Sequence, residues 1–249
     1  MQPVTLTTER LVLHAPTPAD VDAIERACQD PEIARWTTVP SPYGRTDAEE
    51  YVRLVDEWWA DGSQTVWCAY RNGELIASIG LHHITPHDAG GEAELGFWVA
   101  ADARGHGYLT EAARAVVDWA FSELGLARIT WRALVGNVPS ARAARALGFR
   151  YEGLLRQGFT SPRGRYDGWI GGLLATDDRT PVIWSVLDEV DEGPATDDSV
   201  RGQWQDEAMP EMPEVQGLTR FLEERATGRT IERAIVSSIA ALKTFDPPV

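Results

Sequence analysis

Two kinds of hydrophobic pattern divide the first 187 residues into strands and helices. Alternation of apolar and polar residues predicts strands at 10–15, 65–70, 74–81, 92–99, 128–135, 149–153 and 166–175. Helical spacing predicts helices over about 17–29, 46–59, 110–124 and 139–147. This order indicates an α+β fold, in which a mixed sheet is flanked by helices. A last apolar run at 182–187 is expected to join the same core.

Short polar signals mark several element ends. Asn72 and Gly73 tolerate positive φ and predict a tight hairpin between two strands. Thr46 and Glu49 have the spacing of a capping box, which predicts a helix start there. Gly125 is expected to end the helix over 110–124.

The pattern changes after residue 187. Residues 188–208 are acidic and lack apolar periodicity, which predicts a disordered linker. Residues 1–185 hold 24 acidic and 17 basic residues, net −7, whereas residues 186–249 hold 14 and 6, net −8. Three parts are therefore expected, namely a domain over 1–187, the linker, and a segment over 209–249.

Composition argues against several classes of protein. The net charge of −15 leaves no basic footprint for nucleic acid. No apolar run approaches the roughly 20 residues that span a bilayer, and no secretory signal is visible. Cys28 and Cys68 form no CxxC pair, so a reducing cytoplasm is expected.

A histidine cluster raises the question of a metal site. His82, His83 and His87 lie close together in the sequence. No fourth ligand with usable spacing is evident, so we expect them to occupy a strand end and a loop, and we expect no metal.

One segment carries most of the chemical information. The strand EAELGFWV leads through the loop AADARGHG into the helix YLTEAARAVVDWAF. A glycine-containing turn before a helix directs backbone N–H groups and the positive helix end toward an anion, and Arg104 adds a charge. The spacing matches neither an ATP-type P-loop nor a dinucleotide-binding turn. This pattern indicates a cofactor that bears phosphate.

Several motifs together resemble the GNAT superfamily of acyl-CoA-dependent N-acyltransferases. They are TERLVLHAPTPAD, AELGFWVAADARGHGYLTEA, Asn137 to Ser140 followed by ALGF, and the YEG that starts at Tyr151. The closest resemblance is to the ribosomal-protein alanine/serine N-acetyltransferase branch, and it covers about residues 8–178. It implies a mixed, mostly antiparallel sheet and a cytoplasmic acetyltransferase that uses acetyl-CoA.

The resemblance also implies where acetyl-CoA binds. Its pyrophosphate is expected on the loop residues Arg104, Gly105, His106, Gly107, Tyr108 and Leu109, although Leu109 replaces a residue that is usually small. The pantetheine arm is expected beside Phe97, Trp98 and Val99, where the backbone N–H of Phe97 or Val99 could polarise the thioester carbonyl. Asn137 is expected to bond the pantetheine or the loop backbone.

Two residues match positions that carry the chemistry in this family. Glu94 corresponds to a carboxylate that deprotonates the amine, with Glu92 on the same strand face as its rival. Ser140 corresponds to a donor of a proton to the leaving thiolate, and a helix-capping role is the alternative. The tyrosine that many members use as the acid is absent, because residues 143–146 read AARA.

Several alternatives stay open. The acceptor is expected to be a primary amine, either a protein N-terminus or a small molecule, and succinyl-CoA is an alternative donor. A catalytically idle acyl-CoA-binding module is the rival interpretation. A homodimer is also open, whereas nucleic acid and membranes are not expected partners.

The final segment has a resemblance of its own. Residues 209–249 resemble the N-terminus of formamidopyrimidine-DNA glycosylases, in which a terminal proline is the nucleophile. Here Pro210 is internal and its nitrogen is an amide, so no glycosylase activity is expected. We interpret the segment as the start of an unrelated enzyme.

Overall fold

One sheet runs through the part of the chain that the computed structural model describes, residues 1–161 and 164–187. Its strands are β1 (Leu6–Thr7), β2 (Val12–His14), β3 (Thr65–Arg71), β4 (Glu74–Thr85), β5 (Gly91–Val99), β6 (Leu126–Leu134), β7 (Arg150–Ser161) and β8 (Gly164–Leu174). Their order is β1-β2-β3-β4-β5-β6-β8-β7. Neighbours are antiparallel except for β5 and β6, which are parallel. The predicted mixed, mostly antiparallel α+β fold is confirmed.

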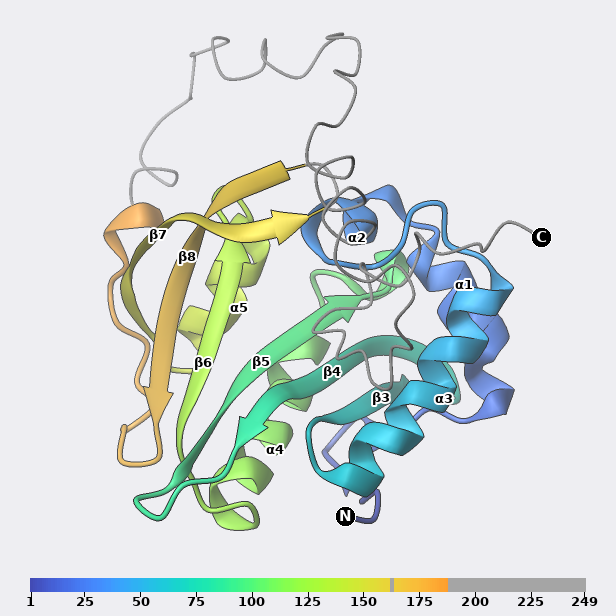
Figure 1. Cartoon of the computed structure of the whole chain (residues 1–249), viewed down its shortest axis with the longest axis horizontal. Coiled ribbons are helices and arrows are strands. Elements are labelled where there is room, and N and C mark those ends of the chain that lie inside the picture. Colours follow the sequence, from blue (N-terminus) through green and yellow to red (C-terminus); the bar gives the residue numbers. More distant parts are fainter. Residues whose placement is uncertain (162–163, 188–249) are drawn as a thin grey trace, which may run out of the picture. The chain divides into compact units, whose positions relative to one another are not determined.

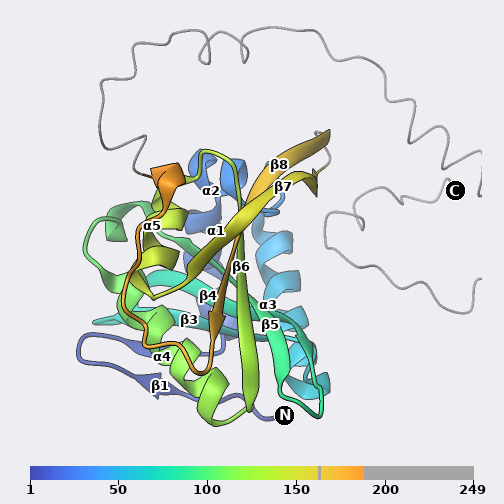
Figure 2. The same cartoon turned by 90° about the vertical axis from the view of Figure 1, so that its left-hand side faces the viewer.

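Helices cover both faces of the sheet. They are α1 (Val21–Cys28), α2 (Pro31–Trp36), α3 (Arg45–Asp61), α4 (Tyr108–Ser122) and α5 (Val138–Ala146), with short 3-10 turns at Pro18–Asp20 and Ala101–Ala103. Helices α1 and α3 lie on one face, and α4 and α5 lie on the other (Figures 1 and 2). Because strand side chains alternate between faces, each strand contributes to both layers.

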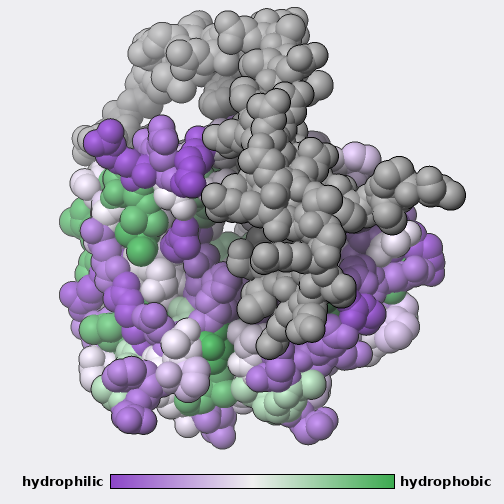
Figure 3. Space-filling view, viewed as in Figure 1, coloured by the Kyte–Doolittle hydropathy of each residue, from purple (hydrophilic) through white to green (hydrophobic). Residues whose placement is uncertain are grey.

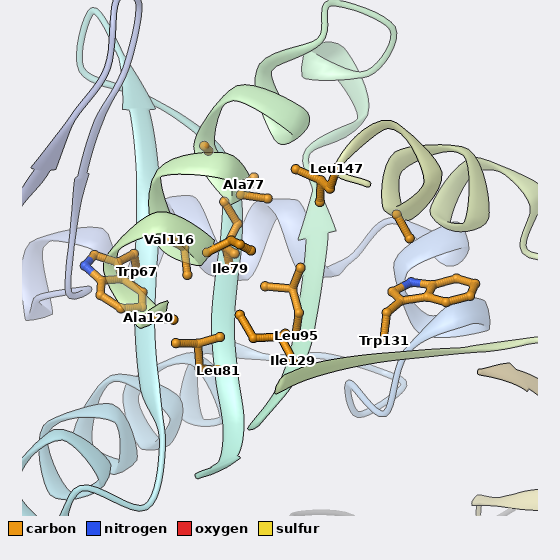
Figure 4. Packing of buried hydrophobic residues seen from close by; sticks show 14 of the residues in the cluster. Trp67, Ala77, Ile79, Leu81, Leu95, Val116, Ala120, Ile129, Trp131 and Leu147 are labelled. Atoms are coloured by element: carbon orange, nitrogen blue, oxygen red, sulfur yellow. The ribbon is translucent and has the colours of Figure 1, made fainter. Parts of the chain in front are cut away.

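The main core lies between the sheet and α4. Ile79, Leu81, Leu95 and Ile129 point from the central strands toward Val116 on α4, and all five are at most 1% exposed (Figure 4). Burying one such side chain contributes roughly 1.5–3 kcal/mol.

The apolar run at 182–187 belongs to this core. Trp184 and Leu187 are each 1% exposed, and the Trp184 indole donates a hydrogen bond to the Phe149 carbonyl across 3.2 Å. The prediction for this run is therefore confirmed.

The local signals had mixed outcomes. Asn72 and Gly73 have φ of 52° and 82° and form the predicted hairpin turn. The capping-box prediction was wrong, because α3 begins one residue before Thr46 and Asp47 accepts a hydrogen bond from the Gly44 N–H at 2.9 Å. Helix α2 was not predicted, although Asp30 before a proline is a typical N-cap.

The visible surface of the described residues is mainly polar, with small separate apolar spots (Figure 3). Across the described residues, the exposed large apolar side chains come from different elements, among them Val12, Leu154 and Ile183. Among the described residues, no helix is both long and apolar enough to cross a membrane. The predicted linker at 188–208 and the glycosylase-like segment at 209–249 lie outside the described residues.

Candidate active site

Strands β5 and β6 separate near the middle of the sheet. Their last register pair is Leu95 with Trp131. Beyond it, β5 stays paired with β4 as far as Val99, and β6 stays paired with β8 as far as Leu134. The two ribbons diverge in Figure 1. One edge of β5 therefore faces this opening from Gly96 onward.

The backbone of β5 presents alternate residues to the opening. The Ala100 N–H donates to the Ile76 carbonyl of β4 at 2.9 Å. Because backbone groups alternate in direction along an antiparallel strand, those of Phe97 and Val99 point away from β4 and into the opening. Trp98 instead turns its backbone to β4. Its side chain packs against a second cluster of buried residues, which includes Ile24 of α1 and Val52 of α3.

The predicted phosphate loop leads directly into α4. Gly105 and Gly107 have φ of +78° and +75°, a region that strongly favours glycine. Gly107 is the N-cap of α4, so the first N–H groups of that helix lack partners within it. Leu109, in the first turn, packs partly buried against the main core.

Arg104 is turned back from the loop. Its Nη2 lies 2.5 Å from Asp30 Oδ2 at the start of α2, and the same atom donates to the Val99 carbonyl at 3.1 Å. The guanidinium therefore links the end of β5 to α2, and its charge is paired.

Two arginines that were not predicted from the sequence lie against this loop. The guanidinium carbons of Arg10 and Arg71 lie 4.6 and 5.3 Å from the centre of the Tyr108 ring, which also stacks on His106. Arg10 donates to Glu111 at 2.6 Å and to the His106 carbonyl at 3.2 Å. Arg71 forms no ion pair with the residues described, so its charge is available near the loop. Arg10 and Arg71 meet only because β3 pairs with the N-terminal strands. No local sequence pattern indicates this pairing.

Glu94 lies on β5 just before the opening, on the sheet face that α3 covers. Its side chain is 26% exposed, and Arg132 Nη1 lies 3.4 Å from its Oε2. Burial raises the pKa of Glu94 above its ordinary value, and the charges of Arg132 and His83 oppose part of that rise. The rival Glu92 is exposed and lies farther from the opening. Glu94 thus has the environment of a carboxylate that can gain and lose a proton.

Ser140 lies in the first turn of α5. The Trp131 indole N–H can only donate, and it donates to Ser140 Oγ at 3.0 Å, so the serine keeps its own proton for another acceptor. The capping alternative for Ser140 was wrong, because the N-cap is Asn137, whose Oδ1 accepts from the Ser140 N–H at 3.3 Å.

The two candidate catalytic residues approach the opening from opposite sides of the sheet. Trp131, which holds Ser140, is the register partner of Leu95, the residue after Glu94. Adjacent residues of a strand point to opposite faces. A group held in the opening would therefore have Glu94 on one side and Ser140 on the other.

The three clustered histidines have different surroundings. His83 and His87 are exposed, whereas His82 is partly buried on β4. Within residues 1–161 and 164–187, no group of three or more His, Cys, Asp and Glu side chains is arranged to hold a metal ion.

Sequence comparison identifies relatives over most of the described residues. The model of the family described as "Acetyltransferase (GNAT) domain" matches residues 10–150. An uncharacterized N-acetyltransferase p20 of Bacillus licheniformis is 27% identical over 163 residues, which are 65% of this chain and 90% of that protein. A putative ribosomal N-acetyltransferase, YdaF of Bacillus subtilis, is 37% identical over 87 residues, or 35% of this chain and 46% of that protein.

Solved structures show the same fold. Mycobacterium smegmatis RimJ in complex with CoA-disulfide superposes with a TM-score of 0.65 at 20% identity, over 76% of this chain and 96% of that one. The homologues support acetyl transfer from acetyl-CoA as the activity of this enzyme. The family match spans more than half of the sequence, and the chain therefore belongs to the GNAT acetyltransferase family.

Proposed function

We propose that this enzyme transfers the acetyl group of acetyl-CoA to a primary amine by direct attack of the amine on the thioester. One observation carries the proposal. The β5–β6 opening has a carboxylate of raised pKa on one side and a serine with a free proton on the other. Acyl transfer to an amine needs both a proton acceptor and a proton donor at the reacting centre.

Acetyl-CoA would bind along the opening and the loop that follows it. The N–H groups at Gly105, His106, Gly107, Tyr108 and Leu109 would bind the pyrophosphate, helped by the positive end of α4. Phe97 and Val99 would bind the pantetheine, and either N–H could polarise the thioester carbonyl. Asn137 would donate its amide Nδ2, because its Oδ1 already caps α5.

Arg104 takes a modified role in this proposal. Asp30 pairs with its guanidinium in the free enzyme. An incoming pyrophosphate would have to compete with Asp30, whereas Arg71 needs no such exchange. Arg104 would therefore act partly by fixing the end of β5.

Acetyl transfer would combine one bond formed, one bond broken and two proton transfers. The neutral amine, whose ammonium proton has gone to solvent, forms a bond from its nitrogen to the carbonyl carbon and gives one N–H proton to Glu94. The C–S bond then breaks, its electron pair stays on sulfur, and Ser140 donates a proton so that CoA leaves as a thiol. Exchange with solvent restores Glu94 and Ser140.

The names of relatives favour a protein N-terminus as the acceptor. One structural neighbour is described as a RimL ribosomal L7/L12 alpha-N-protein acetyltransferase, and another as a putative ribosomal-protein-serine acetyltransferase from Vibrio cholerae. One curated relative is named a putative ribosomal N-acetyltransferase. A peptide N-terminus is a primary amine, as the proposed chemistry requires. Small-molecule amines belong in the same test.

The test is thiol release by the full chain with a panel of peptides, small amines and acyl-CoA donors. We expect acetyl-CoA and at least one primary amine to give turnover, and Glu94→Gln and Ser140→Ala each to lower kcat by about 10²-fold or more. Wild-type rates in both variants would refute the assigned chemistry. Tight acetyl-CoA binding without turnover on any amine would favour an idle binding module.

A further inference from the structure

The His82 ring lies in the space left by the missing side chains of two glycines on the sheet. Gly80 of β4 and Gly96 of β5 are register partners on the face that carries Glu94. A Cβ on Gly80 would lie 2.9 Å from His82 Nε2, and a Cβ on Gly96 would lie 2.8 Å from the same atom. Real Cβ atoms do not approach other atoms so closely, so only glycines admit the imidazole here.

The hydrogen bond at the other ring nitrogen fixes the tautomer. His82 Nδ1 lies 2.5 Å from Gln64 Oε1. A carbonyl oxygen can only accept, so Nδ1 carries the proton and Nε2 carries a lone pair. Burial lowers the pKa of His82 to about 4, which keeps the ring neutral near pH 7. Nε2 has no hydrogen-bond partner among the residues that the structure describes.

This lone pair lies at the start of the β5–β6 opening. Gly96 is the first β5 residue beyond the last β5–β6 pair, and the His82 ring covers it. Glu94 is the register partner of His82 itself. The carboxylate and the bare imidazole nitrogen therefore lie on one face, on neighbouring strands, where the proposed amine must enter.

We propose that His82 Nε2 accepts a hydrogen bond from the attacking amine and so selects primary amines as acceptors. This inference rests on the proposed function. The acceptor reacts as a neutral primary amine, which has already given its ammonium proton to solvent and has two N–H bonds. One N–H is released to Glu94 as the amide forms, and the other points to His82, which aims the nitrogen lone pair at the thioester carbonyl. His82 itself takes no proton.

The selectivity follows from counting N–H bonds. A neutral secondary amine has a single N–H, which it must lose when the amide forms. It cannot hold a hydrogen bond to His82 throughout the attack and also release that proton to Glu94. A primary amine can do both, so His82 should favour it over its N-methyl analogue.

Two substitutions separate the hydrogen bond from the packing of the ring. His82→Asn keeps a donor near Nδ1 for Gln64 but leaves nothing at the place of Nε2. His82→Gln is longer and can put its amide oxygen near that place. His87→Asn is the control, because His87 is exposed in a loop.

The experiment measures kcat and KM for an amine that the wild type acetylates and for its N-methyl analogue. We expect His82→Asn to lower kcat/KM for the primary amine about tenfold, to leave the rate with the N-methyl analogue nearly unchanged, and to keep wild-type acetyl-CoA affinity. His82→Gln should recover most of the loss, and His87→Asn should behave as wild type.

The outcomes keep the two proposals apart. An active wild type whose primary-amine rate is unchanged in His82→Asn, or equal losses with both acceptors, would overturn the role of His82 alone. A wild type that acetylates no amine would refute the proposed function, and this inference with it. Histidine 15N NMR of the enzyme without substrates reports the tautomer of the His82 ring and needs no turnover. A proton on Nε2 in that state would overturn the inference.

Discussion

The Trp131 indole donates a hydrogen bond to the Ser140 hydroxyl oxygen across 3.0 Å and so joins β6 to the first turn of α5. Trp131 is 1% exposed, so the donor of this bond is buried in the core. It fixes the direction of the Ser140 oxygen while leaving its proton free. The position of the proposed acid therefore depends on a core residue of the preceding strand, nine positions earlier in the chain.

Trp131→Phe should separate positioning of Ser140 from its chemistry. The substitution keeps most of the buried volume but removes the N–H, so we expect kcat to fall several-fold while the KM for acetyl-CoA stays within about twofold. Ser140→Ala should lower kcat more, and the double variant should be no worse than Ser140→Ala. Steady-state kinetics checks this, and additive losses would mean that Trp131 acts independently of Ser140.

The acidic limb of the kcat/KM profile should report Glu94. Burial raises the pKa of this carboxyl, so activity should fall on acidification at a pH above the ordinary glutamate value. Arg132 lowers that pKa, so Arg132→Met should shift the limb to higher pH. Glu94→Gln should abolish the limb, and Glu92→Gln, on an exposed side chain, should leave it in place. A limb that stays the same in Arg132→Met would contradict the assignment.

His82 should make stability depend on pH. Its folded pKa is about 4 against an ordinary 6.5, so the unfolded chain binds the proton more readily between these values. Its contribution is fully present above about pH 6.5 and is lost as the pH falls toward 4, and it amounts to about 3 kcal/mol at most.

Urea unfolding at several pH values measures this contribution. The wild type should lose more stability than His82→Gln between pH 6.5 and 4, because the variant has no group that titrates there. Carboxylates that titrate in acid affect both proteins equally, so the difference between the curves is the quantity to compare. Parallel curves would show that His82 titrates normally in the folded protein.

Gly105→Ala should affect acetyl-CoA binding beyond its effect on stability. Gly105 and Gly125 both have positive φ, +78° and +62°, and neither has an atom within 4 Å of an added Cβ. Each alanine should therefore destabilise the fold by about 1 kcal/mol through backbone strain alone. Only Gly105→Ala should weaken acetyl-CoA binding, by about tenfold, as measured by calorimetry. Equal affinity in both variants would place the pyrophosphate elsewhere.

The sequence determined the order of the elements. Alternation and helical spacing depend on which face of each segment is buried, and these faces persist in the folded chain. The strand–loop–helix pattern around Gly105 and Gly107 likewise predicted an anion site, because the backbone of such a loop is set locally. The exact end of an element depended on single side chains: Thr46 and Gly44 both offer a start for α3, and the Asp47 carboxylate, which accepts from the Gly44 N–H, decided between them.

Only the tertiary structure decided how the candidate site is assembled. Strand register puts His82 opposite Glu94, brings Arg132 next to that carboxylate, and sets Trp131 beside Ser140. These partners are separated by 9 to 38 positions in the chain, so no local sequence pattern indicates that they meet. Burial then sets the protonation of Glu94 and His82, because desolvation depends on the whole surrounding fold. The sequence thus determined which chemical groups the chain carries, and the packing of the sheet determined which of them meet and in what charge state.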